Sequence, residues 1–130
     1  MSEKNTSLHY RNYLQLDKIL NAQHPESSSN GDEAHEEMLF IIIHQVYELW
    51  FKQIIHELDS ISYYFKKEKI DEENIGLIVR RVERANKIMS VLVDQIEILE
   101  TMTSLEFLDF RHHLSPASGF QSHQFRSIEL

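Results

Sequence analysis

The stretch that decides the fold is Leu39-Phe40-Ile41-Ile42-Ile43-His44-Gln45-Val46-Tyr47-Glu48-Leu49-Trp50, which is apolar on most of its sides. It opens a longer pattern in which apolar residues recur every three or four positions: Leu39, Ile43, Val46, Trp50, Ile54, Leu58, Ile61 and Phe65. This spacing is one face of an α-helix and predicts a long helix over residues 32–67. A second stripe lies beside it: Phe40, His44, Tyr47, Phe51 and Ile55. We therefore expect most of the girth of this helix to be buried, which calls for more protein than 130 residues supply.

Further helices are predicted toward the end of the chain. A second long helix is expected over residues 71–102, with an apolar seam for antiparallel packing on the first: Ile78, Val82, Ala85, Met89, Leu92, Ile96 and Leu99. Thr103, with Glu106 three residues later, predicts a capping box that opens a short helix over residues 104–113. A last helical pattern over residues 120–130 has no residue to end it, which leads us to expect that the chain is part of a longer protein.

The segment before the long helix is more polar. Residues 1–7 are expected to be a flexible arm, residues 8–22 a short helix, and residues 23–31 a loop rich in Ser, Pro and Gly. Asn30 or Asp32 is a candidate cap for the long helix. No strand-like alternation or internal repeat is present, so the sequence predicts an all-α bundle with two long antiparallel helices, in a single domain over residues 8–130.

Composition excludes several classes of function. Lys and Arg number 13 against 21 Asp and Glu, and the formal net charge of −8 disfavours binding to nucleic acid or to an anionic membrane. The absence of Cys removes disulfides, thiolate metal sites and Cys nucleophiles, and fits a cytoplasmic protein. The longest apolar run, Met38 to Ile43, is far shorter than the roughly 20 residues of a membrane helix.

Two helical pairs are candidates for ligand binding. His44 shares a helix face with Phe40, and an imidazole in apolar surroundings can direct one hydrogen bond to a ligand; the alternative is a core His bonded to Glu48 or to a backbone carbonyl. Arg111 shares a face with Phe107, which suits capture of a carboxylate. The alternative for Arg111 is a salt bridge to a neighbouring acid, Asp109 or Glu106.

Two further possibilities concern cofactors. The segment from Ser115 to Ser122 is made of small residues and Gly, which allow a flat cofactor to approach the backbone, although an ordinary turn explains the same residues. A carboxylate-bridged di-iron bundle uses Glu together with paired Glu-x-x-His motifs. Because that pair does not occur here, the di-iron alternative is disfavoured.

Taken together, these segments resemble the tryptophan 2,3-dioxygenase family over residues 8–130. The resemblance is carried by the motifs Leu8-His9-Tyr10-Arg11-Asn12-Tyr13-Leu14, Glu37-Met38-Leu39-Phe40-Ile41-Ile42-Ile43-His44-Gln45-Val46-Tyr47-Glu48-Leu49-Trp50-Phe51-Lys52, Leu99-Glu100-Thr101-Met102-Thr103, Phe107-Leu108-Asp109-Phe110-Arg111 and Ser115-Pro116-Ala117-Ser118-Gly119-Phe120-Gln121-Ser122. It implies a helical haem dioxygenase that binds haem b and assembles as a homotetramer. The implied reaction is the oxidative opening of the indole ring of L-tryptophan by dioxygen to N-formyl-kynurenine, in tryptophan catabolism by the kynurenine pathway.

The resemblance also assigns roles to residues. Phe40, Ser118 and Gly119 would contact the haem, and His44 would be the catalytic residue that hydrogen-bonds the indole N–H. Arg111 would hold the substrate carboxylate, with Phe107 packed on the substrate. Three N-terminal residues would close the pocket of a neighbouring subunit: Tyr10, Tyr13 and Leu14. Many family members have Tyr where this chain has Phe107, so Arg111 would carry more of the carboxylate binding.

The axial His of the iron is expected outside this chain, because none of its eight His matches that position in the family, and the resemblance therefore predicts no metal ligand in this chain. We therefore expect the chain to supply the distal half of the site and to be inactive alone. A competing hypothesis, from a different class, is a non-catalytic helical module that uses its apolar stripes to oligomerise.

Overall fold

The computed structural model describes residues 8–67 and 69–129, apart from the side chain of Phe120. The elements are α1 (Tyr10–Tyr13), α2 (Leu16–Ile19), α3 (Glu26–Ser29), α4 (Glu37–Phe65), α5 (Glu72–Leu99), α6 (Ser104–Arg111), the 3₁₀ helix η2 (Gly119–Gln121) and α7 (His123–Glu129). The described ranges contain helices and loops and no strand, which confirms the predicted all-α class. The predicted arm, residues 1–7, lies outside the described residues.

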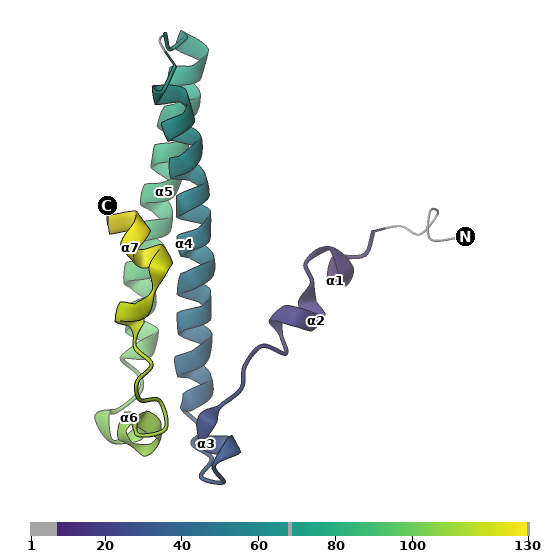
Figure 1. The fold of residues 1–130 in the computed structure, drawn as a ribbon, viewed down its shortest axis with the longest axis vertical. Helices are drawn as coiled ribbons and strands as arrows, with labels where there is room; N and C mark the ends of the chain where they lie inside the picture. Colours follow the sequence, from purple (N-terminus) through teal and green to yellow (C-terminus); the bar gives the residue numbers. More distant parts are fainter. Residues whose placement is uncertain (1–7, 68, 130) are drawn as a thin grey trace, which may run out of the picture.

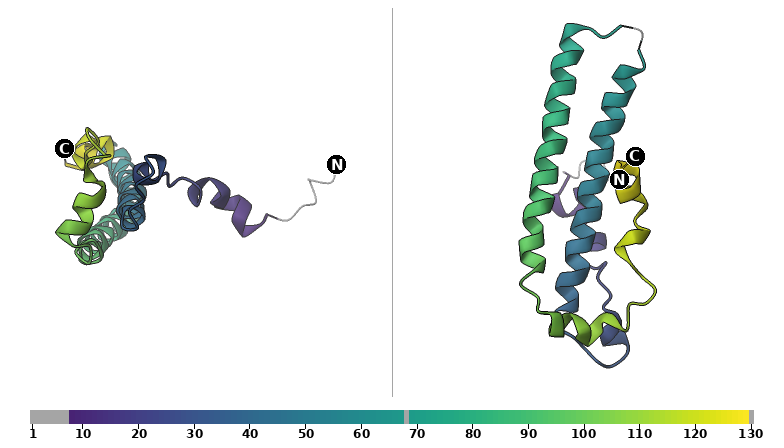
Figure 2. Two further views of the ribbon diagram at one scale, coloured as in Figure 1. Left: turned by 90° about the horizontal axis from the view of Figure 1, so that it is seen from below. Right: turned by 90° about the vertical axis from the view of Figure 1, so that its left-hand side faces the viewer.

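The architecture is an antiparallel hairpin of two long helices, α4 and α5, with short helices around one end (Figure 1). Helix α6 crosses this end, and α7 runs back along the hairpin beside α4 (Figure 2). The core of the hairpin is Ile54 on α4 against Ile88 and Leu92 on α5. Ile54 and Leu92 lie on the predicted stripes, whereas Ile88 was missed: the predicted seam named Met89 beside it, which is 41 % exposed. The Tyr47 hydroxyl donates to the Leu92 carbonyl oxygen at 3.1 Å, and burial raises the pKa of this Tyr.

Helix boundaries follow local chemistry where a cap is present. Helix α6 opens with the predicted capping box: the Thr103 hydroxyl accepts from the Glu106 amide, and the Glu106 carboxylate accepts from the Thr103 amide. The predicted cap of α4 was wrong, because α4 begins at Glu37, and Glu36 at its cap position makes no side-chain cap bond. Neither Asn30 nor Asp32 reaches α4, since a turn through Gly31, at φ 73°, separates α3 from it.

The N-terminal prediction needs correction. Residues 8–22 form two single-turn helices instead of one, because Gln15 between them adopts a left-handed backbone conformation with φ 57°. Neither α1 nor α2 has a buried residue, and both project away from the hairpin in Figure 1. A helix as short as α1 or α2 has little stability of its own. Burial of an apolar face against a core would stabilise a longer helix here, and this segment has no such core.

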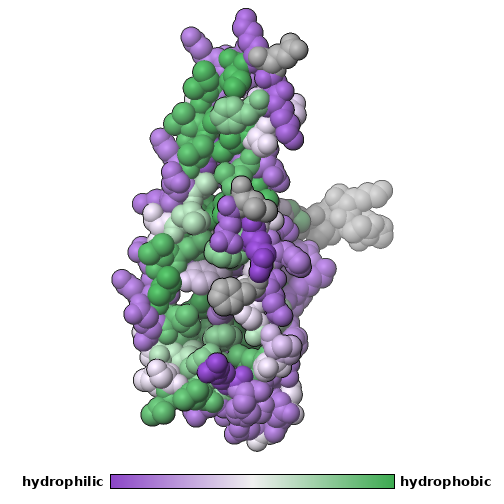
Figure 3. Space-filling view, turned by 60° about the vertical axis from the view of Figure 1, so that its left-hand side comes forward, coloured by the Kyte–Doolittle hydropathy of each residue, from purple (hydrophilic) through white to green (hydrophobic). Residues whose placement is uncertain are grey.

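Much of the apolar surface of the hairpin stays exposed within these residues. Figure 3 shows hydrophobic side chains running along one face of the hairpin. Exposed positions on α4 and α5 include Trp50, Leu58, Phe65, Val79 and Val93. We expected α4 to be buried around most of its circumference, and this chain by itself does not bury it to that extent. So large an exposed apolar face is typical of an interaction surface.

Helix α4, with 29 residues, is long and apolar enough to cross a membrane by length and composition alone. The core helix of a soluble protein passes the same test. Two contacts favour a bundle helix: α5 packs along α4, and the Gln124 amide of α7 donates to the Glu48 carboxylate in the middle of α4 at 2.9 Å. The absence of a membrane partner stays a prediction.

Candidate functional site

An aromatic cluster joins α4 to α6 at the end of the hairpin. The ring centroid of Phe40 lies 4.4 Å from that of His44, 5.7 Å from that of Phe107 and 5.5 Å from that of Phe110. Phe110 is completely buried, so it anchors α6 to the first turns of α4. The i, i+4 spacing read from the sequence places Phe40 and His44 one turn apart, and α6 brings Phe107 to the same place.

Two adjoining hollows open around this cluster. One, of about 620 Å³, is bounded by Phe107, Arg111 and the 115–119 segment, and the other, of about 350 Å³, is bounded by His44, Glu48 and residues 121–122. They share a wall: Phe40, Leu114, Ala117, Ser118 and Gly119. Arg111 and His44, carried on different helices, line different hollows that share this wall, and their predicted roles stay predictions.

The hydrogen bonding of His44 defines its tautomer. Its Nδ1 lies 2.8 Å from the carbonyl oxygen of Phe40, which can only accept, so Nδ1 carries the proton in the neutral ring. The sequence analysis offered Glu48 or a backbone carbonyl as a partner for His44. The bond to the carbonyl is formed, whereas the Glu48 carboxylate accepts a hydrogen bond from Gln124. Nε2 is left with a lone pair and no hydrogen bond within the described part of the chain. A neutral His44 is accordingly an acceptor for an N–H group of a ligand.

Arg111 is positioned as an anion-binding group. Its guanidinium carbon lies 6.0 Å from the centroid of the Phe107 ring, and the side chain is exposed. Within the described residues neither of the two suggested acids pairs with it: Glu106 is taken up by the capping box, and Asp109 makes no ion pair. Hydrogen bonds from the Thr103 amide and hydroxyl lower the pKa of Glu106, which keeps it ionised in that role.

Residues of the segment from Ser115 to Ser122 line both hollows. The Ser118 amide donates to the side-chain oxygen of Gln121 at 3.1 Å, and a single turn of 3₁₀ helix follows. Ala117, Ser118 and Gly119 are all exposed, and a Cβ placed on Gly119 would meet nothing within 4 Å. The backbone at Gly119 is therefore open to approach, and its predicted contact with a flat cofactor stays a prediction.

Three predicted site residues stand apart from the others within this chain. Tyr10, Tyr13 and Leu14 lie on or next to α1, are 75 %, 68 % and 37 % exposed, and line neither hollow. Their predicted place in a neighbouring subunit is not tested by one chain.

Two clusters escaped the sequence analysis. The Glu37 carboxylate, 1 % exposed, accepts hydrogen bonds from the amides of Glu26 and Ser27, both at 2.9 Å, and from the Ser27 hydroxyl at 2.5 Å. Burial alone raises the pKa of Glu37, but these hydrogen bonds and the nearby His113 outweigh it and lower the pKa overall. Ser27 lies in a segment that the sequence predicted as a loop, and Glu37 follows ten residues later. Such a pair carries no periodic signal, so only the fold shows that the two side chains meet.

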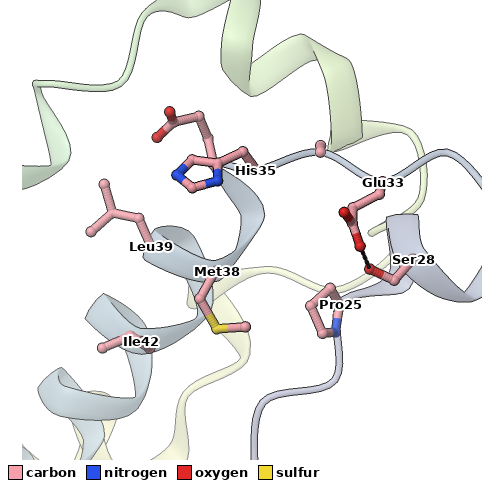
Figure 4. Close-up of a pocket in the computed structure, with 9 residues that line it drawn as sticks. Pro25, Ser28, Glu33, His35, Met38, Leu39 and Ile42 are labelled. Atoms are coloured by element: carbon pink, nitrogen blue, oxygen red, sulfur yellow. Dashed lines mark hydrogen bonds between the residues drawn. The ribbon is translucent and has the colours of Figure 1, made fainter.

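The second missed cluster joins Asp32 to His112 and His113, whose side-chain ligand atoms all lie within 4.8 Å of one another. A separate hollow of about 520 Å³ is lined by Pro25, Met38, Leu39 and Ile42 and by Ser28 and Glu33, which share a hydrogen bond (Figure 4). Neither feature belongs to the aromatic cluster.

The fold and the paired hollows define an all-α protein with a candidate site that is lined by aromatic rings, an imidazole and a guanidinium. A family model described as tryptophan 2,3-dioxygenase matches residues 1–130. The chain therefore belongs to the tryptophan 2,3-dioxygenase family, and the resemblance inferred from its motifs is confirmed.

Named relatives support the same assignment. A tryptophan 2,3-dioxygenase of Bdellovibrio bacteriovorus is 54 % identical over 122 residues, which cover 94 % of this chain and 34 % of the relative. Those of Dictyostelium discoideum and Mus musculus are 59 % and 55 % identical, over 94 % and 92 % of this chain and 30 % of each relative. The chain thus spans about a third of the length of the curated relatives that it matches.

Proposed function

We propose that this chain provides the substrate-binding side of a haem-dependent tryptophan 2,3-dioxygenase, which opens the indole ring of L-tryptophan to N-formyl-kynurenine, the first step of tryptophan catabolism by the kynurenine pathway. One observation carries the proposal: His44 and Arg111 border adjoining hollows that share the Phe40 wall. Tryptophan is a flat apolar ring with an N–H donor at one end and a carboxylate at the other. Its groups match an imidazole acceptor, a phenyl wall and a guanidinium.

The residues of the shared wall also fit haem b. An aromatic ring at Phe40 and an approachable backbone at Ser118 and Gly119 suit the face and edge of a flat macrocycle. Bound haem supplies the dioxygen chemistry through its iron. We assign Phe40, Ser118 and Gly119 to its contact surface, and we expect its axial His outside this chain.

The chain's own side chains bind and orient the substrate. Arg111 pairs with the carboxylate through parallel N–H donors, and Phe107 packs on the ring. His44 accepts the indole N–H at Nε2, because Nδ1 is held by the Phe40 carbonyl. Indole is a much weaker acid than imidazolium, so His44 holds this proton in a directed hydrogen bond and does not remove it.

The assembly is part of the same proposal. In a homotetramer, Tyr10, Tyr13 and Leu14 would leave their own hairpin and close the site of a neighbour, which fits their exposure here. The proposal also includes a cytoplasmic location for the protein and takes L-tryptophan and dioxygen as its substrates. The competing module hypothesis draws on the exposed apolar face of α4 and α5.

The experiment joins this chain to the remaining length of the Bdellovibrio bacteriovorus relative and purifies the chimera with haem. We expect a Soret band, a spectral change on addition of L-tryptophan, and formation of N-formyl-kynurenine. The chain by itself should form no product. A folded chimera that binds no haem and does not respond to tryptophan would favour the oligomerisation module.

Variants of the chimera test the residue roles. Arg111→Ala should weaken tryptophan binding by about 2–5 kcal/mol, because it leaves the substrate carboxylate unpaired. The exposed Arg80→Ala on α5 is its control. His44→Ala should lower turnover and reduce discrimination against 1-methyl-tryptophan while haem stays bound, with the exposed His56→Ala as control. Unchanged affinity in Arg111→Ala, or loss of haem in His44→Ala, would contradict the assigned roles.

A further inference from the structure

Three metal-compatible side chains meet at the end of the hairpin, and one of them, His112, also lines the larger of the two hollows. Asp32 lies in the loop between α3 and α4, and His112 and His113 directly follow α6. Their ligand atoms lie within 4.8 Å of one another, although the residues are some 80 positions apart in the chain. Both segments lie at the same end of the hairpin in Figures 1 and 2.

The backbone holds these residues in place. The Asp32 amide donates to the Ser27 carbonyl oxygen at 2.8 Å, and the His113 amide donates to the Phe110 carbonyl oxygen at 3.0 Å. Phe110 is fully buried and the Ser27 side chain is bonded to Glu37, so both anchors are fixed. The two imidazole rings lie side by side, with centroids 3.9 Å apart. Because the donor set is largely preorganised, little ordering is needed for an ion to bind.

The separation of two donors fits a shared ion better than a direct bond. His113 Nε2 lies 3.6 Å from Asp32 Oδ2, beyond hydrogen-bond distance. Two ligands each about 2.1 Å from one tetrahedral zinc ion lie about 3.4 Å apart. His113 Nε2 is also buried and has no hydrogen-bond partner in the described part of the chain. A buried nitrogen in this state is costly unless a ligand engages it.

We propose that Asp32, His112 and His113 form a binding site for a divalent transition-metal ion, with zinc as the best fit. Two imidazoles and one carboxylate are a donor set that zinc accepts, and the fourth position is open to water. Asp32 and His112 are exposed, which gives the ion a path from solvent. The formal net charge of −8 also favours cations near the chain.

The ion would connect the α3–α4 loop to the end of α6. Arg111 is the residue before His112, so the ion would restrain the backbone that carries this anion-binding side chain. His112 also lines the larger hollow beside Arg111, but the donor set is argued from its own geometry, and the proposal does not rest on the proposed function. An ordinary ion pair between His113 and Asp32 is the competing explanation of the same contact.

Calorimetric titration of the untagged chain with Zn²⁺ tests the proposal, since a polyhistidine tag would itself bind metal. We expect saturation at one ion per chain. Asp32→Asn, His112→Gln and His113→Gln should each weaken binding by about 10–100-fold or more. The exposed His123→Gln on α7 is the matched control and should bind as the parent chain does.

Two further measurements keep the test decisive. Far-UV circular dichroism checks each variant, and His112→Gln changes an exposed side chain, so its fold should be retained. Co²⁺ bound to the parent chain should give a visible absorption band that the three ligand variants lose. Absence of saturable Zn²⁺ binding, or equal binding by the parent chain and all three variants, would overturn the proposal in favour of the ion pair.

Discussion

Glu37 is the most informative position to change, because it takes part in two helices. Its carboxylate accepts hydrogen bonds from the first amides of α3, and the residue itself is the first of α4. The amides of Glu26 and Ser27 are the first two of α3, and both donate to Glu37 together with the Ser27 hydroxyl. Glu37 itself stands in the first turn of α4, where the helix dipole favours a negative charge. The change Glu37→Gln keeps the shape of the side chain and removes its charge.

The magnitude follows from the three bonds. A hydrogen bond to a charged group contributes about 1.5–3 kcal/mol. One Glu37 oxygen accepts both bonds from Ser27 and the other accepts only the Glu26 amide, so the Gln oxygen can keep the Ser27 bonds while its NH₂ faces the Glu26 amide. Loss of that bond, together with the charge that strengthens the other two, costs about 3 kcal/mol. Because α3 has only four residues, the loss should appear first as local opening of α3 rather than as global unfolding.

Amide hydrogen exchange measures this opening directly. A cost of about 3 kcal/mol corresponds to roughly 100-fold faster exchange at Glu26 and Ser27, with little change in the α4–α5 core. Glu97→Gln on the exposed surface of α5 makes the same change in charge and serves as control. Exchange at both amides within about threefold of the parent chain would refute the assignment of Glu37 as the anchor of α3.

The same carboxylate predicts a pH dependence. The pKa of Glu37 in the folded chain lies below its ordinary value of 4.5, so its contribution is fully present above pH 4.5 and is lost as the pH falls through the lower folded pKa. Protection of the Ser27 amide, corrected for intrinsic exchange, should decline in that window. Glu37→Gln should show no such decline, and a matching decline in the variant would assign the effect to another group.

Two further predictions concern packing and capping. Ile54→Ala removes a side chain that is 2 % exposed between Ile88 and Leu92, and should lower the free energy of unfolding in urea by about 2–5 kcal/mol; a loss below about 1 kcal/mol would mean that the hairpin core lies elsewhere. Thr103→Ala removes the hydroxyl that accepts from the Glu106 amide and should destabilise α6 by about 1 kcal/mol, seen as faster exchange of its first amides. Unchanged exchange there would show that the capping box does not support α6.

Periodic and local signals in the sequence were sufficient for much of the fold. The apolar repeat predicted both long helices and their antiparallel packing because burial of a stripe constrains every turn of a helix in the same way. The capping box was readable because its two partners are three residues apart. The N-terminal segment was misread as one helix because its pattern is helical, yet it has no core to hold it together.

What the sequence by itself determined is which side chains share a helix face, as with Phe40 and His44 or Phe107 and Arg111, together with membership of the family. Only the tertiary structure decided which faces meet. Helix α6 folds across the end of the hairpin, which places Arg111 at the Phe40 wall and His113 near Asp32. The turn before α4 places Ser27 against Glu37. These pairs come from separate segments, and no local rule couples their positions. The burial of Phe110 and of the Glu37 carboxylate fixes the positions of the segments that carry these pairs. The reason is that an apolar ring and an ionised group each have few low-energy places in a small protein.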